Sequence, residues 1–307
     1  MKNKKLQTGT SAAGKHKYKF SDCVGLVYIL PWVIGFLSLQ LMPLVKSFWY
    51  SLTSFSMIGD PKFIGLENYK TLFANPDFLK STIVTFKYVL IAVPGKIIFA
   101  LIIALILNQR IKGIGIFRTF YYLPSILGGS VAISVLWRYL FMNQGVVNNL
   151  LGLIGLGPYD WLGNPTLALG TISLVTIWQF GSSMLLFLAG LKQIPMSYYE
   201  AAEIDGASKL RTFWKITLPS LSSIVLFNLI MQMINAFQDF TSAYVITQGG
   251  PMKSTYLYGV MIYDEAFKYF RMGNASAVSW VLFAIILFFT CLTFGSSESW
   301  VHYGDEA

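Results

Sequence analysis

The stretch EAAEIDGASKLRTFWKITLP, residues 200–219, is a polar segment that lies between two long apolar runs of the chain. Seven of its positions form a pattern with fixed spacing, in which three, nine and one residues separate the successive parts. These positions are Glu200, Ala201, Ala202, Gly206, Ile216, Leu218 and Pro219. A match at seven spaced positions is far more specific than a short motif. This segment is therefore the most informative part of the sequence.

Residues 195–219 are predicted to form two short helices joined by a tight turn. Pro195 suits a helix start, because its missing N–H would have no partner there. Met196 to Ala202 can form the first helix, and Gly206 supplies a turn position that is free of Cβ restrictions. A second helix of about 208–217 is expected to end at Leu218-Pro219, where the proline opens the next apolar run.

The composition of the chain is that of an integral membrane protein. Its 307 residues are 55% hydrophobic and only 12% charged, about half the charged fraction of a soluble domain. Apolar runs of about 20 residues are long enough to cross a bilayer. The sequence predicts an all-α membrane protein with six transmembrane helices, at roughly 24–45, 81–107, 119–142, 167–191, 219–240 and 274–294. We expect a cytoplasmic tail at 1–23, a membrane domain at 24–294 and a second cytoplasmic tail at 295–307.

Lysine and arginine are distributed unevenly between the two sides of this six-span topology. Thirteen fall in the N-terminal tail, the 108–118 loop and the 192–218 loop, against seven on the opposite side. Positive charge marks the cytoplasmic side of short loops. Both termini and the polar segment are therefore predicted to be cytoplasmic. The net charge of +9 comes mostly from this asymmetry, so it is not interpreted as a nucleic-acid-binding surface.

The pattern in residues 200–219 matches the EAA signature, and the chain resembles the permease subunits of bacterial ABC importers, in particular the maltose-type, sugar-importing branch. The resemblance extends over nearly the whole chain, although the chain is shorter than the best-known member. It lacks that member's extra N-terminal helix pair and large external insertion. The other matching stretches are FIGLENYKTLF (63–73), RTFYYLPSILGGSVAISVLWRYLF (118–141), WLGNPTLAL (161–169), LKQIPMSYYEAAEIDGAS (191–208) and TQGGP (247–251).

The resemblance implies a type I importer in the bacterial inner membrane. It implies a second homologous permease, two ATPase subunits and an extracellular or periplasmic solute-binding protein as partners. In such importers the helix–turn–helix segment, here within the coupling loop 192–218, docks into a groove on the ATPase. The residues expected to make this coupling contact are Glu200, Ala201, Ala202, Asp205, Gly206, Ala207, Ile216, Leu218 and Pro219.

The chain itself is not expected to be an enzyme. Residues 9–15 match the first seven positions of a phosphate-binding loop, but His16 stands where a Ser or Thr hydroxyl must hold Mg²⁺. We therefore expect no cofactor on this chain, with ATP and magnesium bound by the partner ATPases. Two cysteines and two histidines form no metal-ligand spacing, so no metal site is expected.

Charged residues inside the predicted spans are costly, so each should face a cavity, a partner or the interface. Lys87 lies near the outer end of its span and can reach the headgroups. Lys96 follows Pro94-Gly95 and lies deeper, facing either a partner helix or the translocation path. Arg138 lies near the outer end of span three and is expected to reach the lipid headgroups.

The fifth span carries the richest polar cluster, with residues spaced three and four apart. Amides and a carboxylate can bind sugar hydroxyls, with Phe227, Phe237 and Phe240 offering ring faces nearby. Interhelical hydrogen bonding is the alternative, and helix packing is the alternative on span four. Counting from the EAA motif, the maltose-type family's substrate-contacting positions fall on Gln232 and Asp239, and on Ala236 in place of an amide. The full set of substrate-path candidates is Trp178, Gln179, Ser182, Gln232, Asn235, Gln238 and Asp239.

The leading hypothesis is ATP-driven import of a sugar or oligosaccharide. An acidic, uronate-type oligosaccharide is one candidate, because Lys96 and Arg138 could meet its carboxylates. The alternatives are the same machinery carrying another solute, such as glycerol phosphate or a polyamine, and an ion-coupled secondary transporter. Asp239 alone would suit a cation relay, but an ion-coupled carrier has no use for a complete EAA segment.

Overall fold

The computed structural model describes residues 24–109 and 113–302, which are built from helices, with one isolated antiparallel bridge between Thr53 and Phe63. Residues 1–23, 110–112 and 303–307 lie outside the described residues. The predicted N-terminal cytoplasmic tail, with its phosphate-loop-like stretch at 9–16, therefore remains a prediction.

Residues up to Trp49 form one unit and residues from Tyr50 onward form another. The first unit contains α1 (Val24–Phe36), a π-helical turn (Leu37–Leu41) and most of α2 (Met42–Ser51). Residues Tyr28–Ser51 form a helix long and apolar enough to cross a membrane. This helix ends six residues beyond the predicted limit of the first span.

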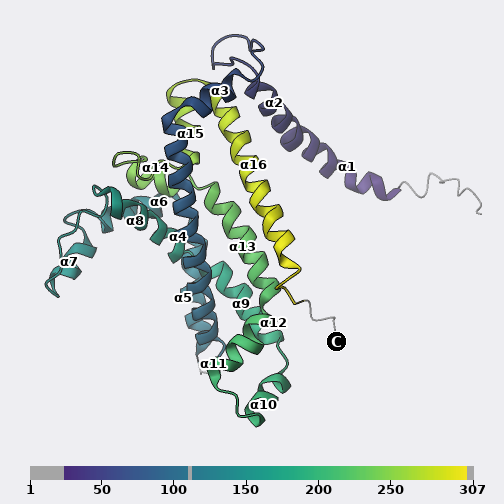
Figure 1. Cartoon of the computed structure of the whole chain (residues 1–307), viewed down its shortest axis with the longest axis vertical. Coiled ribbons are helices and arrows are strands. Elements are labelled where there is room, and N and C mark those ends of the chain that lie inside the picture. Colours follow the sequence, from purple (N-terminus) through teal and green to yellow (C-terminus); the bar gives the residue numbers. More distant parts are fainter. Residues whose placement is uncertain (1–23, 110–112, 303–307) are drawn as a thin grey trace, which may run out of the picture. The chain divides into compact units, whose positions relative to one another are not determined.

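The second unit is organised around α4 (Pro76–Leu107), which is a candidate span of 32 residues (Figure 1). The Asn75 side chain caps its start by accepting a hydrogen bond from Asp77 N at 2.9 Å, with Pro76 in the first turn. Around α4 pack three further helices of the unit, and α16 packs on one of them, α13. Their bounds are α8 Pro165–Trp178, α9 Gly181–Gln193, α13 Ser222–Phe237 and α16 Met272–Ser297.

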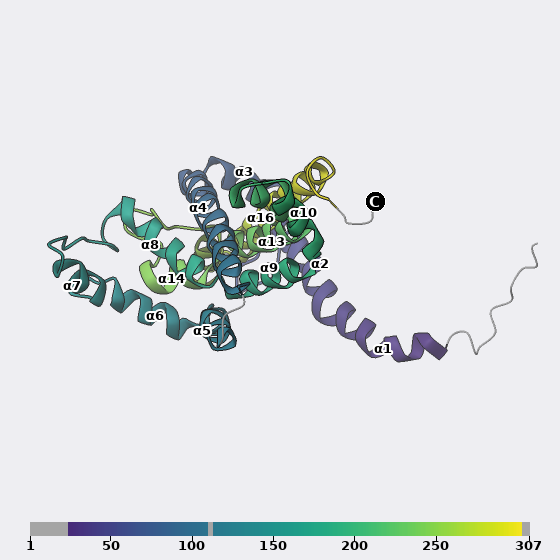
Figure 2. The same cartoon turned by 90° about the horizontal axis from the view of Figure 1, so that it is seen from below.

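Three of the six candidate spans are pairs of helices that meet at a bend. The pair α5 (Ile114–Leu127) and α6 (Val131–Leu140) bends by 104°, and the α8–α9 pair bends by 46°. The helix Lys209–Ser220 joins α13 at a bend of 66°. The described chain therefore has three long candidate spans, or six when each bent pair is counted as one span. Seen from below, α5, α6 and α7 (Val146–Gly152) follow one another along one edge of the second unit (Figure 2).

The bend between α5 and α6 has a local cause that the sequence contains. Gly129 adopts φ +81°, a left-handed conformation that ends a right-handed helix. Ser130 then caps α6 by accepting a hydrogen bond from Ile133 N at 3.3 Å. Backbone groups at the break between α8 and α9 are hydrogen-bonded by a side chain of α5. Ser125 Oγ on α5 donates to Gln179 O at 3.0 Å and accepts from Ser182 N at 3.0 Å.

Short helices occur in the segments that the six-span topology places outside, 46–80, 143–166 and 241–273, and buried asparagines hold two of these helices, α3 and α7. These helices are α3 (Glu67–Ala74), α7, α14 (Thr241–Thr247) and α15 (Tyr258–Tyr263). Asn68 Nδ2 donates to Ser51 O and Thr53 O, each at 2.8 Å. Asn148 bonds both Tyr159 backbone groups and also accepts from Trp161 Nε1 at 2.9 Å. Both asparagine side chains supply hydrogen-bond partners to backbone groups that have none from a helix or a sheet.

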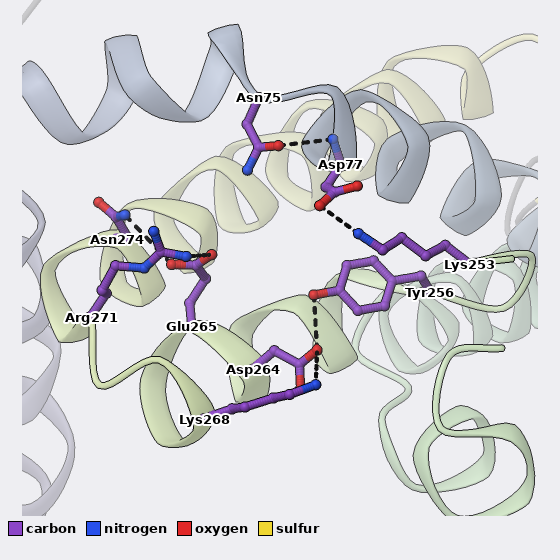
Figure 3. Close-up of polar contacts among 9 residues, drawn as sticks. All are labelled: Asn75, Asp77, Lys253, Tyr256, Asp264, Glu265, Lys268, Arg271 and Asn274. Carbon is purple, nitrogen blue, oxygen red and sulfur yellow. Dashed lines mark hydrogen bonds and ion pairs between the residues drawn. The ribbon is translucent and has the colours of Figure 1, made fainter.

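A cluster of charged and polar side chains ties the 250–274 segment together and links it to the start of α4 (Figure 3). Lys253 Nζ lies 2.5 Å from Asp77 Oδ2. Arg271 pairs with the buried Glu265 at 2.9 Å. Tyr256 donates to Asp264 Oδ2 at 3.1 Å, and burial, followed by the charge of Asp264, raises the pKa of Tyr256 well above its usual value. Its hydroxyl therefore remains a donor at physiological pH.

The contact between α5 and α9 depends on Gly181. A Cβ there would lie 2.7 Å from Tyr121 O and 2.8 Å from Tyr122 Cα, both backbone atoms that cannot rotate away. We expect Gly181→Ala to lower the free energy of unfolding by about 1–3 kcal/mol, the usual cost of overpacking. Thermal unfolding of the purified protein in detergent measures this effect. Gly170→Ala in the adjoining α8 is the matched control, since a Cβ there meets nothing within 4 Å. An equal loss in both variants would contradict the steric argument.

Candidate functional site

Two features of the second unit carry the sequence-predicted functional residues. The first is a hairpin of residues 195–220, formed by α10 (Met196–Ile204) and a second helix. This second helix comprises α11 (Lys209–Thr212), a π-helical segment (Phe213–Thr217) and α12 (Leu218–Ser220). It lies at the opposite end of the unit from α3 and α15 (Figure 1).

The turn of the hairpin is a Schellman motif centred on Gly206. Ala207 N donates to Ala202 O at 2.9 Å and Gly206 N donates to Glu203 O at 3.0 Å, the two bonds that define the motif. Gly206 has φ +67°, as the predicted turn requires. Ser208 then caps the second helix by accepting a hydrogen bond from Arg211 N at 3.3 Å.

The second helix differs from its predicted limits. It continues through Pro219 to Ser220, and the chain bends at Leu221 before α13 begins. Pro219 therefore lies inside this helix and does not open the next span. The π-helical segment directly precedes it, with Leu218 N donating to Phe213 O. Because Pro219 has no N–H, the regular hydrogen-bond ladder cannot continue through that position.

A groove of about 390 Å³ runs between the two helices of the hairpin. Five of the predicted coupling residues line it, namely Ala201, Ala202, Asp205, Ala207 and Ile216. Glu200 and Gly206 are exposed on the hairpin. Leu218 and Pro219 line a neighbouring groove together with Trp300 and His302.

Large apolar side chains of the hairpin are exposed as well as its polar ones. Ile204 at the end of α10 is 86% exposed, and Leu210 and Trp214 on the second helix are 69% and 58% exposed. Tyr199 Oη and Thr217 Oγ1, 3.2 Å apart, link the two helices from inside. The hairpin is thus internally braced and presents exposed apolar side chains from both of its helices.

The C-terminal segment reaches the hairpin, which the sequence did not indicate. Helix α16 continues to Ser297, three residues beyond the predicted end of the sixth span. His302 N then donates to Ser222 Oγ at 2.8 Å, and Ser222 Oγ in turn donates to Pro219 O at 2.6 Å. The bend between the hairpin and α13 is therefore held from the far end of the chain.

The second feature is a cavity of about 270 Å³ among the candidate spans, here named the central cavity. Its walls come from α4, from the α5–α6 and α8–α9 pairs, and from the junction of α13 with α14. Its lining residues are Tyr88, Ala92, Val93, Lys96, Gly129, Ser134, Thr176, Gln179, Gln232, Asn235, Ala236, Gln238, Asp239, Phe240, Thr241 and Ser242.

Three helix breaks meet at the central cavity. Gly129 lies in the α5–α6 break, Gln179 in the α8–α9 break, and Gln238 to Phe240 between α13 and α14. A Cβ on Gly128 would overlap the Gln179 side chain, so the first two breaks are in direct contact. Irregular backbone at membrane depth is tolerated where it is buried in protein or lines a wet cavity. The breaks therefore lie where irregular backbone is tolerated, at the wall of the central cavity.

Asp239 is held by a network that spans three helices. Tyr88 on α4, which is completely buried, donates to Asp239 Oδ2 at 2.5 Å. Ser242 Oγ donates to the same oxygen, and Ser242 N approaches Asp239 Oδ1 at 3.4 Å. Thr176 on α8 pairs with the Tyr88 hydroxyl at 2.7 Å. Asp239 therefore fixes the break between α13 and α14 relative to α4 and α8.

The structure brings most of the predicted substrate-path residues to the central cavity. Gln179, Gln232, Asn235, Gln238 and Asp239 all line it. Helix α13 ends at Phe237. Gln238 and Asp239 therefore lie in the break after the helix, and not on one helical face with Gln232 and Asn235 as their spacing suggested. Gln232 Nε2 donates to the buried Ser183 at 3.1 Å, which is the interhelical bond considered as the alternative.

Other predicted residues lie elsewhere. Trp178 packs on Trp137 with ring centroids 5.6 Å apart, and Ser182 bonds to Ser125; neither lines the central cavity. Arg138 lines a separate groove with Asp160. Lys96 and Arg138 are therefore not in one cavity, contrary to the idea that both meet the carboxylates of one bound sugar residue.

Of the three phenylalanines expected near this path, only Phe240 lines the central cavity. Phe227 is 53% exposed away from it. Phe237 is buried, with its ring 5.4 Å from that of Phe86. Phe240 stacks on Tyr244 at 4.9 Å and lies 5.1 Å from Tyr263, so its ring is supported from behind.

Sequence reasoning missed Tyr88, Thr176 and Ser242, which organise the central cavity. A signal for Tyr88 existed, because Tyr88, Ala92 and Lys96 recur at spacings of four on α4 and so share one helical face. Thr176 and Ser242 are ordinary hydroxyl residues of apolar helices, and such residues usually bond to their own backbone. No local signal distinguishes them.

Comparison with known proteins gives the class of the chain. Residues 71–297 match the family described as "Binding-protein-dependent transport system inner membrane component". The chain is 50% identical over 286 residues to the "Probable ABC transporter permease protein YesP" of Bacillus subtilis, covering 92% of this chain and 93% of that protein. It is 35% identical to the "Trehalose/maltose transport system permease protein MalF" of Thermococcus litoralis, covering 90% and 94%.

The fold is also known from a solved structure. A chain of a bacterial alginate ABC transporter, in complex with an alginate pentasaccharide-bound periplasmic protein, superposes with a TM-score of 0.79 at 21% identity, covering 90% of this chain and 94% of that one. The chain belongs to the family of inner-membrane components of binding-protein-dependent transport systems. It is a permease of the ABC importer type with the type I fold, as the resemblance predicted.

Proposed function

We propose that the chain is one membrane-spanning half of an ATP-driven importer of a sugar or oligosaccharide, with the hairpin as its contact to a separate ATPase. The observation that carries the coupling role is the hairpin itself. It combines a Schellman turn, a groove lined by five of the predicted coupling residues, and exposed apolar side chains on both helices. Exposed apolar side chains that lie together are typical of a surface that a partner covers.

The proposed partners follow from this geometry and from the family. Two ATPase subunits would bind ATP and magnesium and would move the hairpin as they close. A second, related permease would complete the pathway, and a solute-binding protein would deliver the solute from outside. The hairpin and both termini would lie on the cytoplasmic side, as the distribution of lysine and arginine predicts.

The proposed substrate class rests on the chemistry of the central cavity. Asn235 and Gln238 are exposed in the cavity and make no side-chain hydrogen bond within the described chain. Phe240 offers a supported ring face. Free amides suit hydroxyl groups and an aromatic face suits the C–H side of a sugar ring. The trehalose/maltose relative supports this proposal. Asp239 is fully engaged by Tyr88 and Ser242, which argues against an ion-relay role for it.

The turn residue Gly206 gives a test of coupling. Its φ of +67° costs a residue with a Cβ about 1–2 kcal/mol, whereas the open space around it excludes a clash. We expect Gly206→Val to leave insertion and assembly intact but to uncouple ATP hydrolysis from uptake. Gly206→Asn should keep most of the coupling, because Asn tolerates the left-handed conformation.

Uptake and ATP hydrolysis are to be measured together in proteoliposomes that contain each variant. The expected order of coupled transport is wild type, then Asn, then Val. Wild-type transport by Gly206→Val would show that the turn conformation is not required for coupling.

The composition of the complex is a second test. No side chain of α5 is buried within this chain, and the family pairs such a chain with a relative. We expect the active complex to contain a second, different permease and two ATPases, which native mass spectrometry of the purified complex measures. Full transport activity in a complex whose only permease is this chain would contradict the proposal.

The cavity amides give the third test. We expect Asn235→Ala to weaken a sugar contact by about 0.5–1.5 kcal/mol, the net value of a typical hydrogen bond. This corresponds to a rise of about 2- to 13-fold in the sugar concentration for half-maximal stimulation of the ATPase. Gln232→Ala should in addition lower the thermal stability of the complex, because it leaves the buried Ser183 without its donor.

The measurement is sugar-stimulated ATP hydrolysis by the reconstituted complex over a panel of neutral and acidic sugars, with glycerol 3-phosphate as the competing solute class. Basal hydrolysis and assembly should survive in both variants. If both variants instead fail to assemble, these residues pack helices and do not bind solute. If glycerol 3-phosphate alone stimulates ATP hydrolysis, the transported solute belongs to that class and is not a sugar.

A further inference from the structure

Lys96 is a buried cation that the described protein leaves without a partner. It lies on α4, is 8% exposed and lines the central cavity. Its ammonium makes no hydrogen bond or ion pair with any residue of the described ranges 24–109 and 113–302. A charge in such a position is costly unless something pairs with it. The Lys96 ammonium is therefore a donor in the cavity that can bind an acceptor group of a solute.

Asp239 attracts the Lys96 ammonium through its charge but makes no direct ion pair with it. It is the only carboxylate among the described residues of the cavity lining, and it does not come within 4.0 Å of the Lys96 ammonium. Its two oxygens already accept hydrogen bonds from Tyr88 and from the hydroxyl and backbone N–H of Ser242. The carboxylate of Asp239 is thus hydrogen-bonded to protein groups, whereas Lys96 lines the cavity without such a bond.

The rest of the lining describes the molecule to which the acceptor belongs. Gln179, Asn235 and Gln238 contribute amides, and Phe240 contributes a ring that Tyr244 and Tyr263 support. At about 270 Å³ the cavity is slightly smaller than the pockets of about 300–1,000 Å³ that enclose drug-sized ligands. It therefore suits one ring of a chain better than a whole oligosaccharide.

We propose that Lys96 binds the carboxylate of a uronate residue, so that the solute is an acidic oligosaccharide and one of its sugar rings occupies the central cavity. This inference rests on the proposed sugar import and narrows its substrate class. The ammonium meets the carboxylate, the amides meet ring hydroxyls, and Phe240 meets the C–H face. Arg138 has no part in this contact, because it lines a different groove.

The test uses the whole purified complex without its binding protein, so that only the membrane subunits select the sugar. The probes are the trisaccharides of galacturonate, mannuronate and guluronate, each compared with its methyl ester. The readout is the shift in thermal unfolding temperature as a function of sugar concentration, which reports binding to the folded state. Esterification removes the charge and keeps the ring, so the pair isolates the carboxylate.

We expect at least one acid to bind the wild-type complex about tenfold or more tightly than its ester, the factor that a charge-assisted hydrogen bond provides. Lys96→Met should abolish that preference, Lys96→Gln should do the same with a polar head retained, and Lys96→Arg should keep it. Lys87→Met is the matched control, because Lys87 lies on the same helix but is exposed outside the cavity.

Equal binding of acid and ester by the wild type, or an acid preference that survives both Lys96→Met and Lys96→Gln, would overturn the inference. So would the absence of a shift with every acid. In these cases the stimulation of the ATPase by neutral sugars, with the binding protein present, tells the two proposals apart. Stimulation by neutral sugars keeps sugar import and removes the acidic substrate, whereas no stimulation by any sugar removes both.

Discussion

A backbone polar group inside a membrane must find a partner within the protein, and this constraint explains where the central cavity lies. Two candidate spans are interrupted beside the cavity and α13 ends there, and each of these breaks frees N–H and C=O groups. Ser125 supplies both a donor and an acceptor to the α8–α9 break. Asp239 accepts hydrogen bonds at the α13–α14 break. The breaks need polar side chains, and polar side chains need a wet or enclosed space, so both occur together.

The same arrangement joins the central cavity to the hairpin. Helix α13 has 16 residues, a length of about 24 Å, and runs from the bend beside the hairpin to the cavity wall. Its first residue, Ser222, is tied to Pro219 and His302, and its last turns carry Gln232 and Asn235. A displacement of the hairpin would therefore act on one end of a stiff helix whose other end lines the central cavity.

Much of this arrangement could be predicted from the sequence, because it depends on local chemistry. The hydrophobic runs predict six spans, and Gly206 in its polar segment predicts a left-handed turn, which the structure has at φ +67°. The breaks were missed because apolar composition continues through them. The network of Tyr88, Thr176 and Asp239 was missed because it joins residues up to 151 positions apart, and hydropathy contains no information on such pairs. Gln238 and Asp239, which the sequence predicts as substrate-path residues, line the central cavity, but the assumption that one continuous helix carries them was wrong.

Polar residues in an apolar segment look alike in a sequence, but their partners divide them into two kinds. Asp239 and Gln232 are satisfied by the protein, through Tyr88, Ser242 and Ser183. Lys96 and Asn235 line the same space and have no such partner within the described chain. The desolvation cost of the first kind is offset by the closed bundle, and these residues hold the helices in place. The cost of the second kind is offset only when water or a solute enters the central cavity, and this is the physical reason for proposing that these unpaired groups select the solute.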